Sequence, residues 1–185
     1  MSTRRAKVRF NYRDYCLLPE DKRYELIDGE LYMAPAPGTR HQAFLRNLGL
    51  LVWTHVRDNR LGQVFFSPCD VILSDEDVVQ PDLLFVARER QGIISERGCE
   101  GPPDLVVEVL SPSTQGRDRE LKRKLYAKYG IREYWLVDPE ARNIQVMELG
   151  TDDFGNRGVY GEESEFTSGV IPSLSLTVSQ VFLVE

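Results

Sequence analysis

Apolar and polar residues alternate along this chain with two different periods, and the period separates predicted strands from predicted helices. RYELIDGELYMAP alternates on both sides of Asp28-Gly29, a pair typical of tight two-residue turns, so it predicts a β-hairpin. HQAFLRNLGLLVWTHVRD instead carries its apolar residues at helical spacing and predicts a long helix over residues 41–58. A short helix is predicted before the hairpin, at residues 11–18.

The rest of the chain predicts mainly strands, with one further helix among them. The strand-like segments are QVFFSPCDVILSD (two strands, interrupted at Pro68), VVQPDLLFVA, DLVVEVLS, REYWLVD and NIQVMEL. A helix is predicted from about residue 113 to Tyr129, ending at Gly130. Residues 88–103 are predicted as a loop that includes one helical turn, and residues 150–165 as a mobile loop. The apolar tail from Val170 onward is expected to pack back onto the body.

This order of elements predicts a mixed α/β fold, with a central mixed sheet flanked by helices and an added N-terminal hairpin. The length of 185 residues favours a single domain spanning residues 1–185. A hydrophobic content of 42% supports a real core, and no run of apolar residues is long enough to predict a membrane span. The basic start lacks the apolar segment of a signal peptide, so we expect a cytoplasmic protein.

Charge and metal-binding residue types narrow the function classes. The net charge of −6 argues against a dedicated nucleic-acid binder, because phosphate contacts need clustered Lys and Arg. It does not exclude a nuclease, since an acidic metal pocket contributes negative charge itself. The three cysteines lie far apart without a CxxC pair, and the two histidines are isolated. We therefore expect no disulfide framework, no thiolate zinc site and no histidine-rich metal site.

Glu108 is the first candidate for chemistry, because it lies in DLVVEVL, a strand that is otherwise almost wholly apolar. Such a run indicates burial on both faces, where a carboxylate is costly unless it binds a metal ion or finds partners. The alternative is a structural role, in which Glu108 pairs with an arginine or caps a neighbouring loop.

A second carboxylate is needed to share a metal ion with Glu108. Asp104 lies on the same strand and the same face, but about 13 Å away, which is too far for one cation. Asp82 begins the strand DLLFV, which can lie beside DLVVEVL, so these two carboxylates can converge on one magnesium ion. The alternative for Asp82 is an ordinary turn residue after Pro81.

A lysine on the following helix is predicted to complete the site. Asp118, Lys122 and Tyr126 form a row at four-residue spacing on that helix. Lys122 lies about 10 Å along the helix, near the level of Glu108, whereas Lys128 lies about 9 Å deeper. The alternative for Lys122 is a solvated residue paired with Asp118.

These pieces together resemble a known nuclease motif. Pro81-Asp82 followed by Glu108-Val109-Leu110 is similar to the PD-(D/E)xK motif, with Leu110 in place of its lysine. Residues 12–150 resemble the Uma-two family of restriction-endonuclease-like proteins through RYELIDGELYMAPAP, VVQPDLLFV, PPDLVVEVLSPST and GIREYWLVDPE. The resemblance implies a restriction-endonuclease-like fold. It also implies Mg²⁺ or Mn²⁺ bound by Asp82, Glu108 and the Val109 carbonyl, with the lysine moved onto the next helix.

Three further residues form a second tier. Glu25 resembles a family position and either reaches the metal ion through water or faces outward from the hairpin. His41 also matches a family position, and it either contacts a phosphate or caps and packs. Tyr126 either hydrogen-bonds a metal-bound water or packs in the core.

The implied activity is a metal-dependent endonuclease that hydrolyses phosphodiester bonds of DNA, with Lys122 orienting the attacking water or stabilising the developing charge. The residues expected to contact the substrate are Arg117, Arg119, Arg123 and Lys124, with Arg4, Arg5, Lys7 and Arg9. Solvated charged faces are the alternative for both clusters. Cleavage of both DNA strands would favour a homodimer.

Two other functions stay open. The first is a catalytically quiet module on the same fold that binds nucleic acid or protein, which the acidic pI and the displaced lysine favour. The second is a glycosidase that uses Asp82 and Glu108, although this reading leaves Lys122 unexplained.

Overall fold

Two six-stranded mixed sheets organise the molecule, which the computed structural model describes over residues 8–19 and 21–183. The central sheet has the order β12-β11-β10-β9-β6-β3. Its strands are β3 (Gly62–Phe66), β6 (Leu83–Ala87), β9 (Leu105–Val109), β10 (Glu133–Asp138), β11 (Asn143–Leu149) and β12 (Phe154–Gly161). Only β9 and β10 run parallel among its neighbouring strands.

The second sheet has the order β2-β1-β5-β4-β8-β7, and a separate two-stranded ribbon lies near the C-terminus. The strands of this sheet are β1 (Arg23–Ile27), β2 (Glu30–Ala34), β4 (Val71–Ser74), β5 (Asp77–Val79), β7 (Ile94–Ser95) and β8 (Gly98–Cys99). The ribbon consists of β13 (Glu165–Thr167) and β14 (Ser175–Thr177). The predicted N-terminal hairpin, β1 and β2, is therefore part of a whole second sheet.

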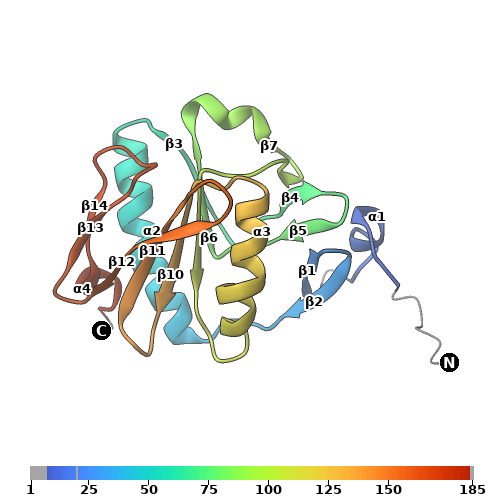
Figure 1. The fold of residues 1–185 in the computed structure, drawn as a ribbon, viewed down its shortest axis with the longest axis horizontal. Coiled ribbons are helices and arrows are strands. Elements are labelled where there is room, and N and C mark those ends of the chain that lie inside the picture. The colour runs from blue at the N-terminus through green and yellow to red at the C-terminus, as the bar shows by residue number, and fades with distance from the viewer. Residues whose placement is uncertain (1–7, 20, 184–185) are drawn as a thin grey trace.

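Helices cover both faces of the central sheet (Figure 1). The α-helices are α1 (Tyr12–Tyr15), α2 (Thr39–Asp58), α3 (Arg123–Lys128) and α4 (Val178–Val181). The long helix α2 packs on one face together with the C-terminal segment, whereas α3 and the second sheet pack on the other. No helix in the described part of the chain is long and apolar enough to cross a membrane.

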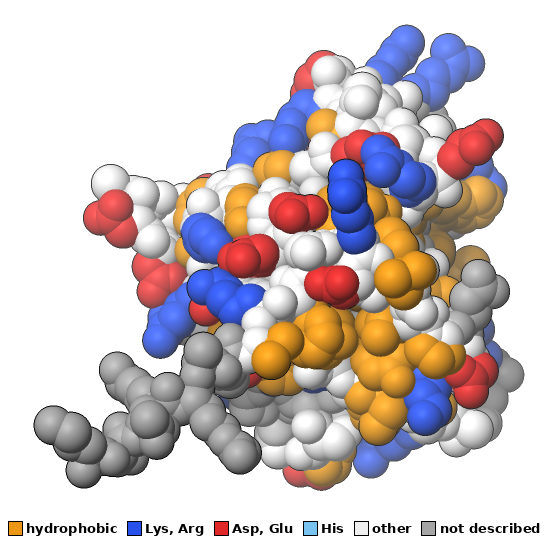
Figure 2. Space-filling model, turned by 90° about the vertical axis from the view of Figure 1, so that its right-hand side faces the viewer, with side chains coloured by type: hydrophobic (Ala, Val, Ile, Leu, Met, Phe, Trp, Pro, Cys, Tyr) orange, Lys and Arg blue, Asp and Glu red, His pale blue; other side chains and the backbone are white. Residues whose placement is uncertain are grey.

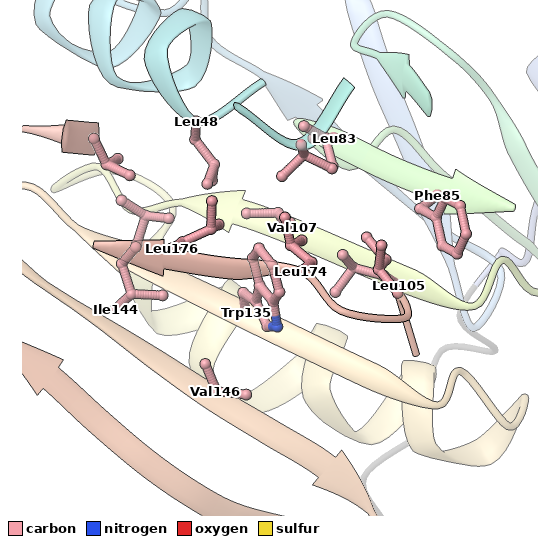
Figure 3. Close-up of a cluster of buried hydrophobic side chains, with 14 of the residues drawn as sticks. Leu48, Leu83, Phe85, Leu105, Val107, Trp135, Ile144, Val146, Leu174 and Leu176 are labelled. Carbon is pink, nitrogen blue, oxygen red and sulfur yellow. The ribbon is translucent and has the colours of Figure 1, made fainter. Parts of the chain in front are cut away.

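The alternation of side chains along β6 and β9 explains why both strands are apolar throughout. Leu83 and Val107 point to the face that carries α2, where Leu48 meets them (Figure 3). Leu84 and Val106 point to the opposite face, toward α3. A strand buried on both faces has no position for a solvated residue, so any charged side chain within it needs partners.

The predicted strand VVQPDLLFVA divides into two strands that belong to different sheets. Gln80-Pro81-Asp82 separates β5 from β6. Proline has no N–H to donate, so it interrupts the hydrogen-bonded ladder at this point. The break leaves Asp82 directly before β6, at the junction of the two sheets.

The two predicted loops contain more regular structure than their composition indicates. Residues 150–165, expected to be a mobile loop, include the eight-residue strand β12, which pairs with β11. Since β12 is an edge strand, its glycines and its polar residues Asn156 and Arg157 are accommodated without disturbing the core. Residues 88–103 hold the expected helical turn, as a 3-10 helix (Arg88–Ile93), and in addition the short pair β7–β8.

The predicted helix at residues 113–129 is present, but it begins with a π-helical stretch at Arg117–Lys122 and becomes α-helical only in α3. Gly130, with φ of +77°, follows its end as expected. The C-terminal tail packs back as predicted, because Leu174, Val178 and Phe182 are buried against α2 and the central sheet. The mixed α/β fold class is confirmed.

Candidate active site

The site is built where β6 begins and β9 ends. The two strands pair antiparallel, with Leu83 opposite Val107, so the next position along β9 lies beside Asp82. The backbone N–H of Val109 donates to Asp82 Oδ2 at 2.8 Å. The structure therefore brings Asp82 and the Glu108-Val109 segment together, as the strand pattern predicts.

Glu108 points away from α2, toward the helix that carries Lys122. The alternation along β9 places Glu108 on the same face as Val106, which packs against α3. Two donors bind its Oε1 atom: the Tyr126 hydroxyl at 2.7 Å and the Lys122 ammonium at 2.8 Å. Glu108 is 4% exposed, so these contacts are made largely out of solvent.

Lys122 lies at the centre of a group of carboxylates. Its Nζ is 2.7 Å from Glu25 Oε1, 2.8 Å from Glu108 Oε1 and 3.5 Å from Asp118 Oδ1. Lys122 is only 3% exposed, so it is not the solvated lysine of the alternative reading. It ends the π-helical stretch, and such local widening of a helix is frequent at functional sites.

The net effect of burial and neighbouring charges is to raise the pKa values of Lys122, Glu108 and Asp118. Burial acts against the charge on Lys122, but Glu108, Glu25 and Asp118 outweigh it and hold its pKa above the ordinary range. Burial raises the pKa of Glu108 well above its usual value, and Asp118, Asp82 and Glu25 raise it further against the effect of Lys122. Burial likewise raises the pKa of Asp118. Lys122 is therefore protonated. Its single positive charge does not neutralise the three carboxylates, Glu25, Glu108 and Asp118, that surround it.

A cavity of about 260 Å³ opens onto this group. The predicted residues that line it are Glu25, His41, Asp82, Glu108, Val109, Arg117 and Lys122. The cavity thus gathers residues from the hairpin, from the start of α2, from both strands and from the helix that precedes α3. Tyr126, a second-tier residue, does not line it, because its ring is fully buried behind Glu108.

Comparison with known proteins assigns this architecture to a family. The family model Uma2, described as "Putative restriction endonuclease", matches residues 11–179. The chain belongs to the Uma2 family. This confirms the Uma-two resemblance read from the sequence motifs.

Two relatives show how far the Uma2 likeness extends. A solved structure described as a "putative nuclease belonging to DUF820", from Anabaena variabilis, superposes with a TM-score of 0.78 and covers 94% of this chain and 97% of its own. At 20% sequence identity it establishes the fold alone. An uncharacterized protein of Synechocystis sp. is 27% identical over 144 residues, which are 76% of this chain and 81% of the relative.

The second-tier residues of this Uma2 chain all lie at the site. Glu25 is 2% exposed and faces inward, so the outward-facing alternative is wrong. His41 Nε2 lies 3.0 Å from Asp82 Oδ2, which fixes the orientation of that carboxylate. Tyr126 donates directly to Glu108.

The basic residues expected to contact substrate are mostly engaged within the chain. Arg119 pairs with Asp138 at 2.7 Å and Arg123 with Asp153 at 2.8 Å, whereas Lys124 is exposed. Arg117 lines the cavity and lies 3.5 Å from Glu25. In the second cluster, Arg9 pairs with Asp28 and Glu76, while Arg4, Arg5 and Lys7 lie outside the described residues.

Asp104 and Lys128, which the sequence reasoning considered and set aside, have structural partners elsewhere. Asp104 is completely buried and accepts hydrogen bonds from Ala87 N, Arg90 and Arg132. Lys128 contacts Asp77 at 3.1 Å. Neither residue lines the cavity, whereas Asp82 and Lys122, which the arguments from strand length and helix depth preferred, both do.

Sequence reasoning missed several cavity residues, including Arg23 and the segment 34–38, where the hairpin ends. Gln80 lines the cavity, and its backbone N–H donates to Glu25 Oε1 at 3.1 Å. Ser111, Ser113 and Thr114 also line the cavity, where the chain leaves β9. The available signal was position, because QPD directly precedes the strand of Asp82 and SPST directly follows the strand of Glu108.

The residues of the cavity fit a divalent cation held by few protein ligands. Four carboxylates line it against one lysine and two arginines, a formal excess of one negative charge when His41 is not counted. Glu25 Oε2 and Asp118 Oδ1 are buried without a hydrogen-bond partner, so the site has acceptor capacity to spare. Within residues 8–19 and 21–183, no group of three or more His, Cys, Asp and Glu side chains is placed to hold a metal ion alone. Mg²⁺ takes one or two carboxylates and keeps several waters, so Asp82 and Glu108 are the residues that could hold it in this cavity.

Proposed function

We propose that this Uma2 protein is a metal-dependent endonuclease that hydrolyses phosphodiester bonds of DNA in the 260 Å³ cavity. One observation carries the proposal: a buried, protonated lysine lies 2.8 Å from Glu108, beside the start of the strand that follows Asp82. A buried cation among carboxylates at an open cavity suits the stabilisation of an anionic transition state more than the stability of a core.

The metal ion would be held by Asp82, Glu108 and the main-chain carbonyl of Val109. When bound, Mg²⁺ or Mn²⁺ would supply Lewis-acid polarisation of the phosphate and a more acidic bound water. The hydrogen bond from Val109 N and the contact with His41 fix the carboxylate of Asp82 before any ligand arrives. Such preorganisation reduces the rearrangement needed during the reaction.

Lys122 is assigned an electrostatic role rather than that of a general base. Its neighbours hold its pKa above the ordinary range, so it keeps its proton at neutral pH. A protonated ammonium can donate to a phosphate oxygen or to the attacking water, but it cannot accept a proton from that water. Glu25 and Asp118 act as positioning residues, because they hold the ammonium beside Glu108.

Substrate contacts are proposed at Arg117 and Lys124. Arg117 lines the cavity, where its guanidinium can reach a phosphate next to the cut bond. Lys124 is exposed on the adjoining helix. Arg119 and Arg123 would first have to leave their carboxylate partners, so their contribution is expected to be smaller. A single site cuts one strand, and we propose a homodimer for double-strand cleavage.

The test is cleavage of supercoiled DNA in Mg²⁺, in Mn²⁺ and in EDTA, by the wild type and by Asp82→Asn. The matched control is Asp152→Asn, which removes the same charge from an exposed position. We expect nicking or linearisation by the wild type and the control, only with a divalent ion. Asp82→Asn should lose about 10²-fold or more of the rate.

Equal cleavage by Asp82→Asn and the wild type would contradict the assigned site. A wild type that binds DNA but cuts it with neither ion would instead support the interaction-module hypothesis. Three carboxylates already engage Lys122, and this is the observation that favours that second function.

A further inference from the structure

We propose a second nucleic-acid contact, here called the arginine hollow, formed by Trp53, Arg57, Arg60 and Arg88. It lies where α2 ends, β3 begins and β6 ends, away from the candidate active site. The inference rests on the proposed function, because it adds a contact for the nucleic acid that flanks the cut bond.

The composition of the arginine hollow sets it apart from the rest of this acidic chain. A hollow of about 450 Å³ is lined by these three arginines, Trp53, Gln63 and Gln91, and no acidic residue lines it among those described. The chain as a whole has 29 acidic residues against 23 Lys and Arg. On the face shown in Figure 2, by contrast, acidic and basic side chains lie interspersed, with apolar side chains gathered below them. A local excess of positive charge in an acidic protein indicates an anionic ligand.

Trp53 adds an aromatic surface to this charge. Its side chain is 39% exposed, although the other tryptophan, Trp135, is completely buried. The guanidinium carbon of Arg57 lies 4.4 Å from the centre of the Trp53 ring, while its Nε donates to Asp58. Stacked aromatic and guanidinium planes are the groups on which unpaired bases stack.

Arg60 occupies a backbone position that favours glycine. Its φ is +55°, and its N–H donates to Arg57 O where α2 ends. Glycine adopts this conformation with less strain at a helix end. The negative end of the helix dipole also favours cations here, which accounts in part for Arg57 and Arg60. The dipole does not account for Arg88 on a different element or for an exposed tryptophan.

Strand β6 links the arginine hollow to the candidate active site. Asp82 directly precedes β6 and Arg88 directly follows it. Six residue steps in an extended strand span about 20 Å, which is the rise of about six nucleotides at 3.4 Å each. A strand longer than this can contact both places at once, so the occupant that fits best is a nucleic-acid strand continuous with the substrate.

The experiment measures binding of a fluorescein-labelled 20-nucleotide single strand by anisotropy in EDTA, where metal-dependent cleavage does not occur. The test variant is Arg57→Gln, Arg60→Gln, Arg88→Gln, and Arg88→Gln alone is the milder second variant. The matched control is Arg13→Gln, Lys22→Gln, Arg97→Gln, which removes three exposed charges elsewhere. We expect about tenfold weaker binding by the triple variant, with a salt slope smaller by about 2, as three lost phosphate contacts predict. The control should bind like the wild type.

A second readout uses Trp53 itself. Because Trp53 is exposed and Trp135 is buried, iodide should quench mainly Trp53, and the 20-nucleotide strand should protect it. A 4-nucleotide strand should lose little affinity in the triple variant, since it is too short to span both places. Equal affinity and salt slope in the triple variant and the control, or no binding by the wild type, would overturn the arginine hollow. A wild type that binds through these arginines but never cleaves would refute the proposed function and leave this contact standing.

Discussion

The two ends of β9 each present a buried carboxylate on the same face of one strand, and they differ in what surrounds it. Asp104, just before β9, is fully satisfied by the Ala87 N–H, by Arg90 at 2.8 Å and by Arg132 at 3.3 Å. Glu108, near the other end, shares one lysine with two further carboxylates and faces a cavity.

This contrast separates a carboxylate with a structural role, Asp104, from one with a proposed role in the reaction, Glu108. At Asp104, positive partners match the charge, and the carboxylate anchors the 3-10 helix of Arg90 to the sheet. At Glu108, the surroundings are short of positive charge, and burial raises the pKa of the carboxyl well above its usual value. A site that is short of positive charge is one that a cation or a cationic partner can complete.

The largest expected difference between the two ends is in activity. Glu108→Gln should reduce the rate of DNA cleavage by about 10³-fold or more, because it removes a proposed metal ligand while keeping the shape of the side chain. Asp104→Asn should cleave at a rate within a few fold of the wild type, once rates are normalised to folded protein. Rates of plasmid nicking in Mg²⁺ give the comparison, and an inactive Asp104→Asn that is fully folded would break it.

For the free energy of unfolding, the larger effect is expected at Asp104. Asp104→Ala leaves Arg90 and Arg132 without their shared partner and leaves the Ala87 N–H unsatisfied, so it should destabilise the fold by about 2–4 kcal/mol. Urea denaturation followed by circular dichroism measures this change. The lower part of the range is favoured because both arginines are partly solvated. A loss below about 0.5 kcal/mol would show that Asp104 does not anchor this end of the strand.

Much of this contrast could be predicted from the sequence. The contacts that could not be predicted depend on how distant elements pack together. The strand rise of 3.3 Å was sufficient to exclude Asp104 from the site of Glu108, and the helical rise was sufficient to prefer Lys122 over Lys128. Glu25 could not be assigned, because the partner of a hairpin residue depends on how the second sheet folds over the first. The partners of Arg119 and Arg123 were equally hidden, since Asp138 and Asp153 lie on other elements.

The strand β12 shows the limit of composition as a guide. Its three glycines after Phe154, with Asn156 and Arg157 among them, are typical of a loop, yet it extends the sheet by pairing with β11. An edge strand needs backbone pairing on one side only and tolerates solvated side chains, so the apolar signal that identifies β6 or β9 is absent. The division of VVQPDLLFVA had a visible cause in Pro81, but the sequence does not reveal that the two parts join different sheets.

The raised pKa of Glu108 also predicts how the stability of the metal-free protein depends on pH. Because burial raises the pKa of Glu108, the folded state holds its proton to a higher pH than the unfolded state does. Its stabilising contribution is complete below about pH 4.3, the unfolded value, and is lost as pH rises through the folded value. In EDTA, Glu108→Gln should therefore gain stability relative to the wild type as pH rises from 4.5 to 8. Lys122 keeps Glu25 and Asp118 as partners in this variant, and its raised pKa leaves it charged throughout the range.

Denaturation midpoints at several pH values give that difference. A wild type that gains stability over Glu108→Gln with rising pH would contradict the assignment of burial as the dominant effect on this carboxyl.

A smaller effect is expected from the metal ion itself. At ten times its dissociation constant, Mg²⁺ should stabilise the wild type by about 1.4 kcal/mol, because it binds the folded state alone. Asp82→Asn should show little of this gain, whereas Asp104→Asn should show all of it. Thermal denaturation over a series of Mg²⁺ concentrations distinguishes these outcomes, and equal stabilisation of all three proteins would indicate binding elsewhere.

The most direct test of the central claim compares the removal of two different lysines from the same helix. Lys122→Met removes the buried ammonium at Glu108, while Lys124→Met removes an exposed charge two residues away. Initial rates of Mg²⁺-dependent cleavage should fall by about 10²-fold or more for Lys122→Met and by less than tenfold for Lys124→Met. Equal rates for the two folded variants would contradict the claim that this cavity is a nuclease site.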